Sequence, residues 1–111
     1  MQQYPQPYSC TNVIASAVRS YMKIWFKIMK DSKLLAQETI VDDGYDTRTH
    51  KIMNAIAEAC QRFDLEQPYW LKKNEQEFLA SAKTRFTPNN FIEEVDFDYL
   101  EILVLEEDFV I

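Results

Sequence analysis

Glycine is nearly absent from this chain: Gly44 is the only one among 111 residues. Glycine adopts positive backbone φ angles at the least cost, so most turns here must use Asn, Asp or Ser. The phosphate-binding loops of nucleotide-binding proteins need several glycines close together. The sequence therefore contains no such loop.

Histidine and cysteine are also scarce, although they build most metal sites and many nucleophilic centres. His50 is the only histidine, and Cys10 and Cys60 are the only cysteines, with no CxxC pair. We therefore predict no metal, no cofactor and no catalytic residues, and an enzyme is the less favoured interpretation. Because nothing marks secretion, we interpret both cysteines as reduced and the protein as cytoplasmic.

Long apolar runs and an excess of basic charge are missing as well. No run reaches the length of a membrane span, and VIASAV (13–18) is too short for the core of a signal peptide. The net charge of −6 argues against non-specific binding to nucleic acid, which needs a basic surface. We therefore predict neither a membrane nor a nucleic-acid partner.

Acidic charge, by contrast, is concentrated near the C-terminus. Residues 1–92 hold twelve Lys/Arg and ten Asp/Glu, a net of +2, whereas residues 93–111 hold eight Asp/Glu and no base, a net of −8. A solvated rim is the plainest interpretation of such charge. The alternatives are weak cation binding and docking on a basic protein partner, with the acids imitating nucleic-acid phosphates.

Alternating residues predict strands over 22–30 and 98–107. Asp31 and Ser32 form a plausible two-residue turn into an antiparallel partner over 33–41. Both faces of 98–107 are substantially apolar, which is typical of a central strand. If this strand neighbours the first one, Glu101 can oppose Lys23 or Lys27.

Helical spacing of apolar residues predicts two helices, over 48–63 and 75–86. Asp46 or Thr47 is expected to cap the first, and Asn74 with Glu77 resembles a capping box for the second. QPYWL (67–71) is placed on a sheet edge or in a loop because Pro68 cannot donate to an inner ladder. The predicted fold is α+β, a small mainly antiparallel sheet in the order β-β-α-(β)-α-β with both helices on one face.

The first 21 residues differ in composition from the rest. They begin with a stretch rich in Gln, Pro and Tyr, and residues 11–21 can form a short helix. We interpret 1–21 as a leader, extended and then helical or disordered, and 22–111 as a single domain. An ordinary N-terminal helix of the domain is the alternative.

The second face of the predicted sheet is unusually apolar for a surface that meets water. It carries Trp25, Met29, Tyr99, Leu103 and Leu105. Either the leader helix covers this face or a second subunit does. The leading hypothesis is a non-enzymatic intracellular interaction module that self-associates as a homodimer through it.

The start of the first helix is the candidate ligand site. Thr47, Arg48 and His50 lie where a helix N-terminus favours anions. The corresponding hypothesis is a small-anion binder, or an enzyme that combines His50 with a carboxylate such as Asp96. A capping or surface role is the simpler interpretation of these residues.

Six segments between residues 22 and 108 can be compared with known sequences: MKIWFKI, DTRTHKI, EACQRFDL, PYWL, RF and NNFIEEVDFDYLEI. On these segments, residues 22–108 resemble a small family of uncharacterised bacterial proteins. It implies no activity, because the family has no assigned function. It supports Met22 as the natural start and directs attention to DTRTHKI and FIEEVDFDYLEI.

Overall fold

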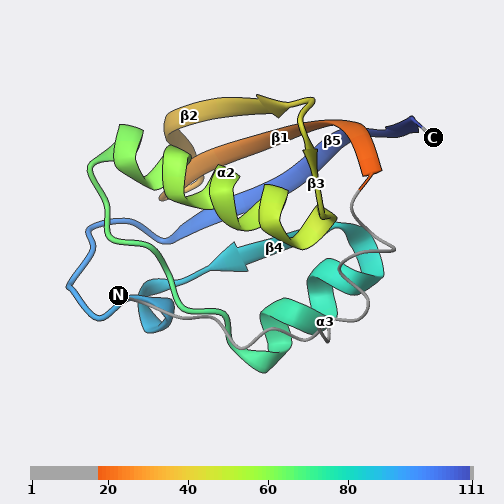
Figure 1. Cartoon of the computed structure of the whole chain (residues 1–111). Helices are drawn as coiled ribbons and strands as arrows, with labels where there is room; N and C mark the ends of the chain where they lie inside the picture. The colour runs from red at the N-terminus through yellow and green to blue at the C-terminus, as the bar shows by residue number, and fades with distance from the viewer. Residues whose placement is uncertain (1–17, 111) are drawn as a thin grey trace.

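The computed structural model describes residues 18–110, with side chains from 21 to 108. The fold is built on an antiparallel sheet with the strand order β2-β1-β5-β4 (Figure 1). A short strand, β3, pairs with the start of β1. The strands are β1 (Val18–Lys30), β2 (Lys33–Asp42), β3 (Tyr45–Asp46), β4 (Lys83–Phe86) and β5 (Tyr99–Val110).

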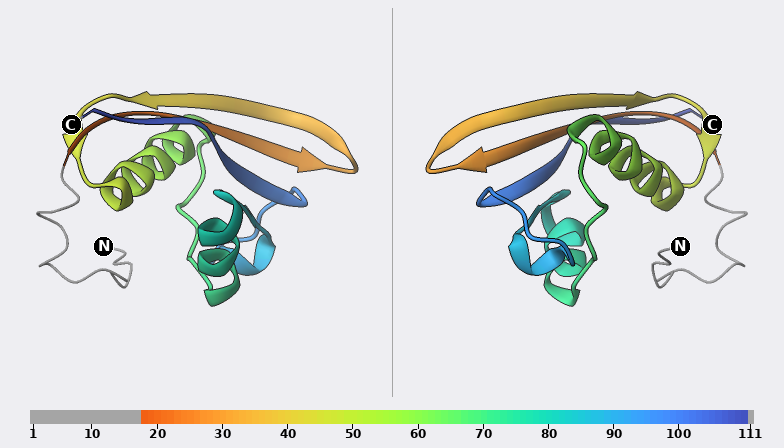
Figure 2. Two further views of the ribbon diagram at one scale, coloured as in Figure 1. Left: turned by 90° about the vertical axis from the view of Figure 1, so that its right-hand side faces the viewer. Right: turned by 90° about the vertical axis from the view of Figure 1, so that its left-hand side faces the viewer.

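Two helices, α2 (Arg48–Phe63) and α3 (Lys72–Ser81), lie on the same side of the sheet, and no helix within residues 18–110 covers the other side (Figure 2). A 3-10 turn, η1 (Pro88–Asn90), follows β4 with Pro88 at its first position. The α+β fold with an antiparallel sheet and two helices on one face is confirmed.

The core fills the space between the sheet and the helices. Alternate residues of β1, which include Met22, Ile24 and Phe26, point into it and are fully buried. Ile56 of α2 and Ile102 of β5 meet them, and both are also fully buried. The period of two in β1 therefore separates a core face from an outer face, as expected for a strand whose sheet is covered on one side.

The β1–β2 hairpin closes through Asp31 and Ser32, which have φ angles of 53° and 64°. Two successive positive φ angles match the turn whose twist suits a two-residue hairpin. The carboxylate of Asp98 accepts a hydrogen bond from the Asp31 amide at 2.8 Å, and the Asp98 amide donates to the Met29 carbonyl at 2.9 Å. The predicted turn is confirmed, and the start of β5 supports it.

The second helix and the fourth strand differ from the prediction. The helix starts at Lys72, so Asn74 lies inside its first turn, and Ala82 ends it with a left-handed φ of 55°. The chain then extends, and Lys83–Phe86 pairs with β5. QPYWL (67–71) forms a loop, which was one of its two predicted placements, and Pro68 is buried in it. The edge strand therefore follows the second helix and does not precede it.

The described part of the chain begins four residues before Met22. Residues 18–21 belong to β1 and pair with β5 and β3. The remainder of the predicted leader, residues 1–17, lies outside the described residues, and so does most of the short helix expected over 11–21. Backbone pairing thus joins the last part of the predicted leader to the sheet.

Candidate functional site

The five predicted interface residues lie together on the open sheet face. Trp25 is directly opposite Leu103, and Met29 is directly opposite Tyr99, so each pair shares the face. These four side chains are half-buried, whereas Leu105 is 44% exposed. We define the open face as the outward residues of β1, β2, β4 and β5 that no helix of the described chain covers (Figure 2).

Strand β2 adds two apolar side chains that the sequence analysis did not assign to this face. Leu34 is paired with Met29, and Val41 is paired with Lys23. They are 46% and 53% exposed. The sequence does not indicate which residues of β2 face the core, because apolar residues occur on both of its sides. The register with β1 determines which of them face outward.

A charged row crosses the open face. Glu101 is only 4% exposed, and its carboxylate forms ion pairs with Lys27 Nζ at 3.1 Å and with Arg85 Nε at 3.2 Å. The pairing of Glu101 with Lys27 confirms one of the two predicted alternatives. Lys23 and Glu106 form a second, longer pair at 3.9 Å. Every one of these carboxylates thus faces a cation on a neighbouring strand.

The aromatic rings of the open face lie beneath cations. Lys27 Nζ is 4.5 Å from the centre of the Trp25 ring, and the Arg85 guanidinium is 4.3 Å from that of Tyr99. Trp25 Nε1 donates to Gln37 Oε1 at 2.9 Å. Long basic side chains cover part of the apolar area in this way, which explains why the rings are half-buried without a helix above them.

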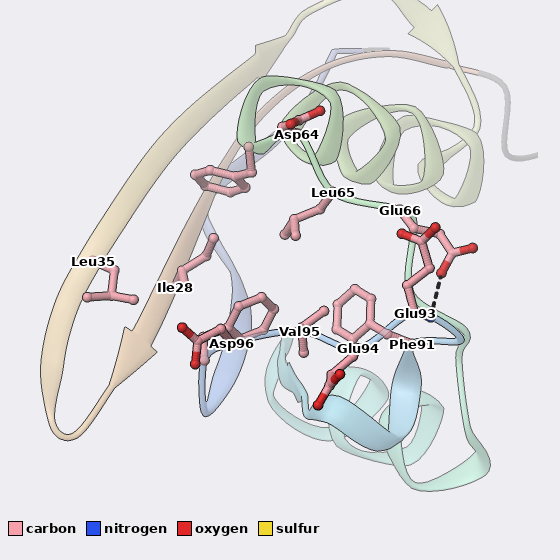
Figure 3. Close-up of a pocket in the computed structure, with 12 residues that line it drawn as sticks. Ile28, Leu35, Asp64, Leu65, Glu66, Phe91, Glu93, Glu94, Val95 and Asp96 are labelled. Atoms are coloured by element: carbon pink, nitrogen blue, oxygen red, sulfur yellow. Dashed lines mark hydrogen bonds between the residues drawn. The ribbon is translucent and has the colours of Figure 1, made fainter.

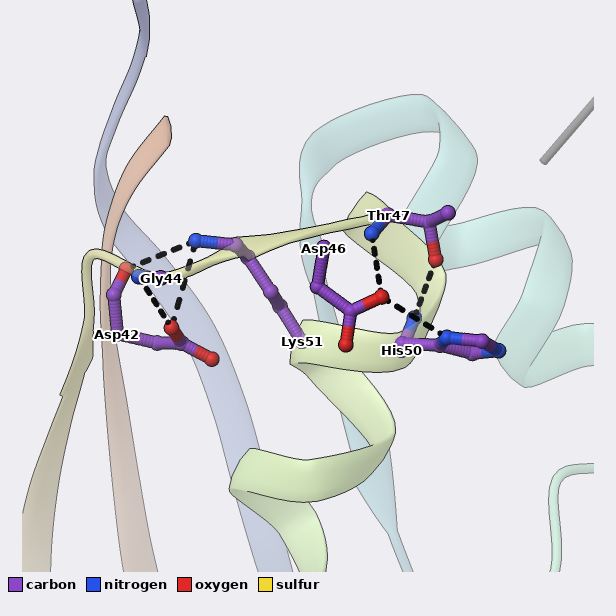
Figure 4. A network of polar contacts seen from close by, with 6 residues as sticks. All are labelled: Asp42, Gly44, Asp46, Thr47, His50 and Lys51. Carbon is purple, nitrogen blue, oxygen red and sulfur yellow. Dashed lines mark hydrogen bonds and ion pairs between the residues drawn. The ribbon is translucent and has the colours of Figure 1, made fainter. Parts of the chain in front are cut away.

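The predicted anion site at the start of α2 is engaged by the protein's own carboxylates. Thr47 caps the helix and accepts from the His50 amide at 3.1 Å (Figure 4). Asp46 Oδ1 accepts from the Thr47 amide at 2.7 Å and lies 3.0 Å from His50 Nδ1. Arg48 Nε donates to Glu107 at 2.8 Å. An external anion would therefore have to compete with Asp46 and Glu107.

The structure does not bring Asp96 to His50. Asp96 pairs with Lys30 at 2.7 Å at the hairpin end of β1, a contact that raises the pKa of Lys30. His50 contacts Asp46, which is paired with Val18 at the other end of that strand. Twelve residues of strand span about 40 Å. Thus His50 and Asp96 do not form a catalytic pair.

Cys60 is 1% exposed on the core side of α2, and burial raises the pKa of its thiol from 9.0 to about 12. Because only the thiolate attacks alkylating reagents, we expect Cys60 in a Cys10→Ser variant to react with iodoacetamide about 100-fold more slowly in the native protein than in guanidinium. Mass spectrometry of timed samples measures both rates. Equal rates would show that Cys60 is accessible in the folded state.

Residues 18–110 contain neither a cluster of side chains suited to a metal ion nor a helix suited to a membrane. No group of three or more His, Cys, Asp or Glu side chains in that range is arranged to hold a metal ion. None of its helices has the length and apolar character needed to cross a membrane. Comparison of the chain with protein families, with curated proteins and with solved structures finds no match.

Proposed function

We propose that the protein is a non-enzymatic intracellular interaction module that self-associates as a dimer through the open face. The observation that carries the proposal is a sheet face with apolar side chains on three strands and no helix of the described chain above it. Leu34, Val41 and Leu105 are about half exposed there. Exposed apolar side chains gathered on one face are typical of interaction sites.

The charge pattern favours a second copy as the partner. A two-fold symmetric interface places the same patch against itself, so a patch of one charge sign would repel its copy. On the open face Glu101 lies between Lys27 and Arg85, and Glu106 lies beside Lys23. The cations and carboxylates are thus interspersed. Two open faces can therefore stack at ordinary sheet spacing with cations of one copy near carboxylates of the other.

The test replaces two exposed apolar residues of the open face with lysine. We expect the double variant Val41→Lys, Leu105→Lys to raise the dimer dissociation constant about thirtyfold, since it places four charges in one symmetric interface. Sedimentation velocity over about 1 to 100 µM protein measures the constant. Both side chains are about half exposed, so the monomer should keep its fold.

The matched control introduces the same charge elsewhere. Leu79 of α3 and Ile92 are 73% and 70% exposed and lie outside the open face. Leu79→Lys with Ile92→Lys should leave the dissociation constant unchanged. A parent protein that stays monomeric throughout the concentration series would overturn the proposal, and so would an equal loss of association in both double variants.

A further inference from the structure

A hollow with an apolar floor lies on the helix side of the sheet, away from the open face (Figure 3). Its volume is about 340 Å³, which is within the range of protein ligand pockets. The apolar lining comes from β1, β2, the end of α2 and the segment before β5: Ile28, Leu35, Phe63, Leu65, Phe91, Val95 and Phe97. Segments far apart in the sequence therefore build one apolar depression.

Five carboxylates line the same hollow, from Asp64, Glu66, Glu93, Glu94 and Asp96 (Figure 3). Within residues 21–108, Asp96 is the only one of them that has a Lys or Arg partner, which is Lys30. Glu66 accepts one weak hydrogen bond, from the Glu93 amide at 3.3 Å. The rim therefore carries about four negative charges that no cation of the described chain balances.

The hollow continues into a shallower groove of about 630 Å³ along the end of α2. Four residues line both depressions: Asp64, Leu65, Glu66 and Glu93. The groove adds Ala57, Gln61 and Gln67. Together the two depressions reach from Leu35 of β2 to Ala57 and Gln61 of α2, and most of their apolar lining belongs to the hollow. Two linked depressions with a shared wall suit an extended chain better than a compact small molecule.

We propose that this acidic groove binds an extended basic peptide segment of a partner protein, with an apolar side chain in the hollow and flanking Lys or Arg against the rim. Charge complementarity requires a cationic occupant, since a nearly unpaired acidic rim repels anions and also repels the same groove of a second copy. The apolar floor provides the binding energy that a purely ionic contact lacks, because exposed ion pairs are individually weak. This site is separate from the open face.

The probe is a fluorescein-labelled peptide of about ten residues that alternates lysine and leucine, long enough to span the groove when extended. Fluorescence anisotropy measures its dissociation constant for the full chain. We expect Glu93→Gln with Glu94→Gln to weaken binding about tenfold at low salt, and Leu35→Gln to weaken it about threefold. All three side chains are exposed, so the variants should fold.

The matched control removes the same charge far from the groove. Asp43 and Asp108 are exposed, and Asp43→Asn with Asp108→Asn should change the peptide affinity by less than about twofold. Equal weakening by both double variants would overturn the proposal, because it would reflect net charge alone. Spermine or oligolysine binding as tightly as the alternating peptide would also overturn it, since the apolar floor would then contribute nothing. Sedimentation of the groove variants, expected to match the parent, separates this result from the dimer test.

Discussion

Replacing Asn74 with leucine should lower the free energy of unfolding by about 4 kcal/mol, although the two side chains are similar in size. Asn74 is fully buried and makes four hydrogen bonds. Its oxygen accepts from the Leu71 amide at 3.0 Å and from Asn90 Nδ2 at 2.8 Å. Its nitrogen donates to Thr84 Oγ1 and to the Arg85 carbonyl, each at 2.9 Å.

The loss is large because leucine leaves several buried polar groups without their partner. Each unsatisfied group costs about 1–3 kcal/mol. These four bonds connect the start of α3, strand β4 and η1, so their loss should also loosen β4 from the sheet edge. Urea unfolding monitored by tryptophan fluorescence measures the difference.

The control for Asn74→Leu is Gln76→Leu, in the same helix and with the same change from amide to leucine. Gln76 is exposed, so its replacement should alter stability by less than about 0.5 kcal/mol. A loss below about 1 kcal/mol for Asn74→Leu would contradict the central role given to this amide.

Replacing Asp42 with asparagine should cost about 3 kcal/mol of stability. Lys51 of α2 is completely buried, and its ammonium lies 3.3 Å from Asp42 Oδ1 and donates to the Asp42 carbonyl at 3.2 Å (Figure 4). Asparagine keeps an oxygen for the Gly44 amide, which donates to Asp42 Oδ1 at 2.9 Å. The variant therefore removes one negative charge beside a buried cation and keeps the hydrogen bond to Gly44. Chemical unfolding at neutral pH measures the loss.

Replacing the cation of this pair, Lys51, should cost much less stability. Lys51→Met fills the same space without a charge, and the Asp42 carboxylate, which is 29% exposed, can be hydrated instead. We expect a loss below about 1.5 kcal/mol. Asp43→Asn, next to Asp42 but exposed, is the control for the loss of one acid. Equal losses for Asp42→Asn and Lys51→Met would show that the charge of Lys51 is not desolvated.

The elements that the sequence predicted best are those with strong periodicity. Helix α2 has the predicted bounds, 48–63, because a helical apolar stripe coincides with a capping Thr47. The central strands β1 and β5 follow from their alternation over many residues. In contrast, β4 is only four residues long. Phe78, Ala82 and Phe86 are spaced four residues apart, so this segment was predicted as the end of the second helix. A short edge strand of this kind forms only because β5 offers it a partner.

The sequence indicated only some of the carboxylates that line the acidic groove. The run of acids after Glu93 was evident, but Asp64 and Glu66 are nearly thirty residues earlier and carry no recognisable pattern. The open face was predicted from β1 and β5 alone. The placement of Arg85 opposite Glu101 depends on strand β4, which was not predicted, so this second cation on Glu101 could not be anticipated.

By itself, the sequence determined which residues of β1, β5 and α2 face the core, and that negative charge gathers near the C-terminus. These properties depend on residue order within one segment, where side-chain direction repeats with a fixed period. Tertiary structure decided the strand order, the pairing of Glu101 with two cations, the engagement of His50 by Asp46 and the acidic groove. Each of these depends on register and contacts between distant segments, which no local pattern specifies.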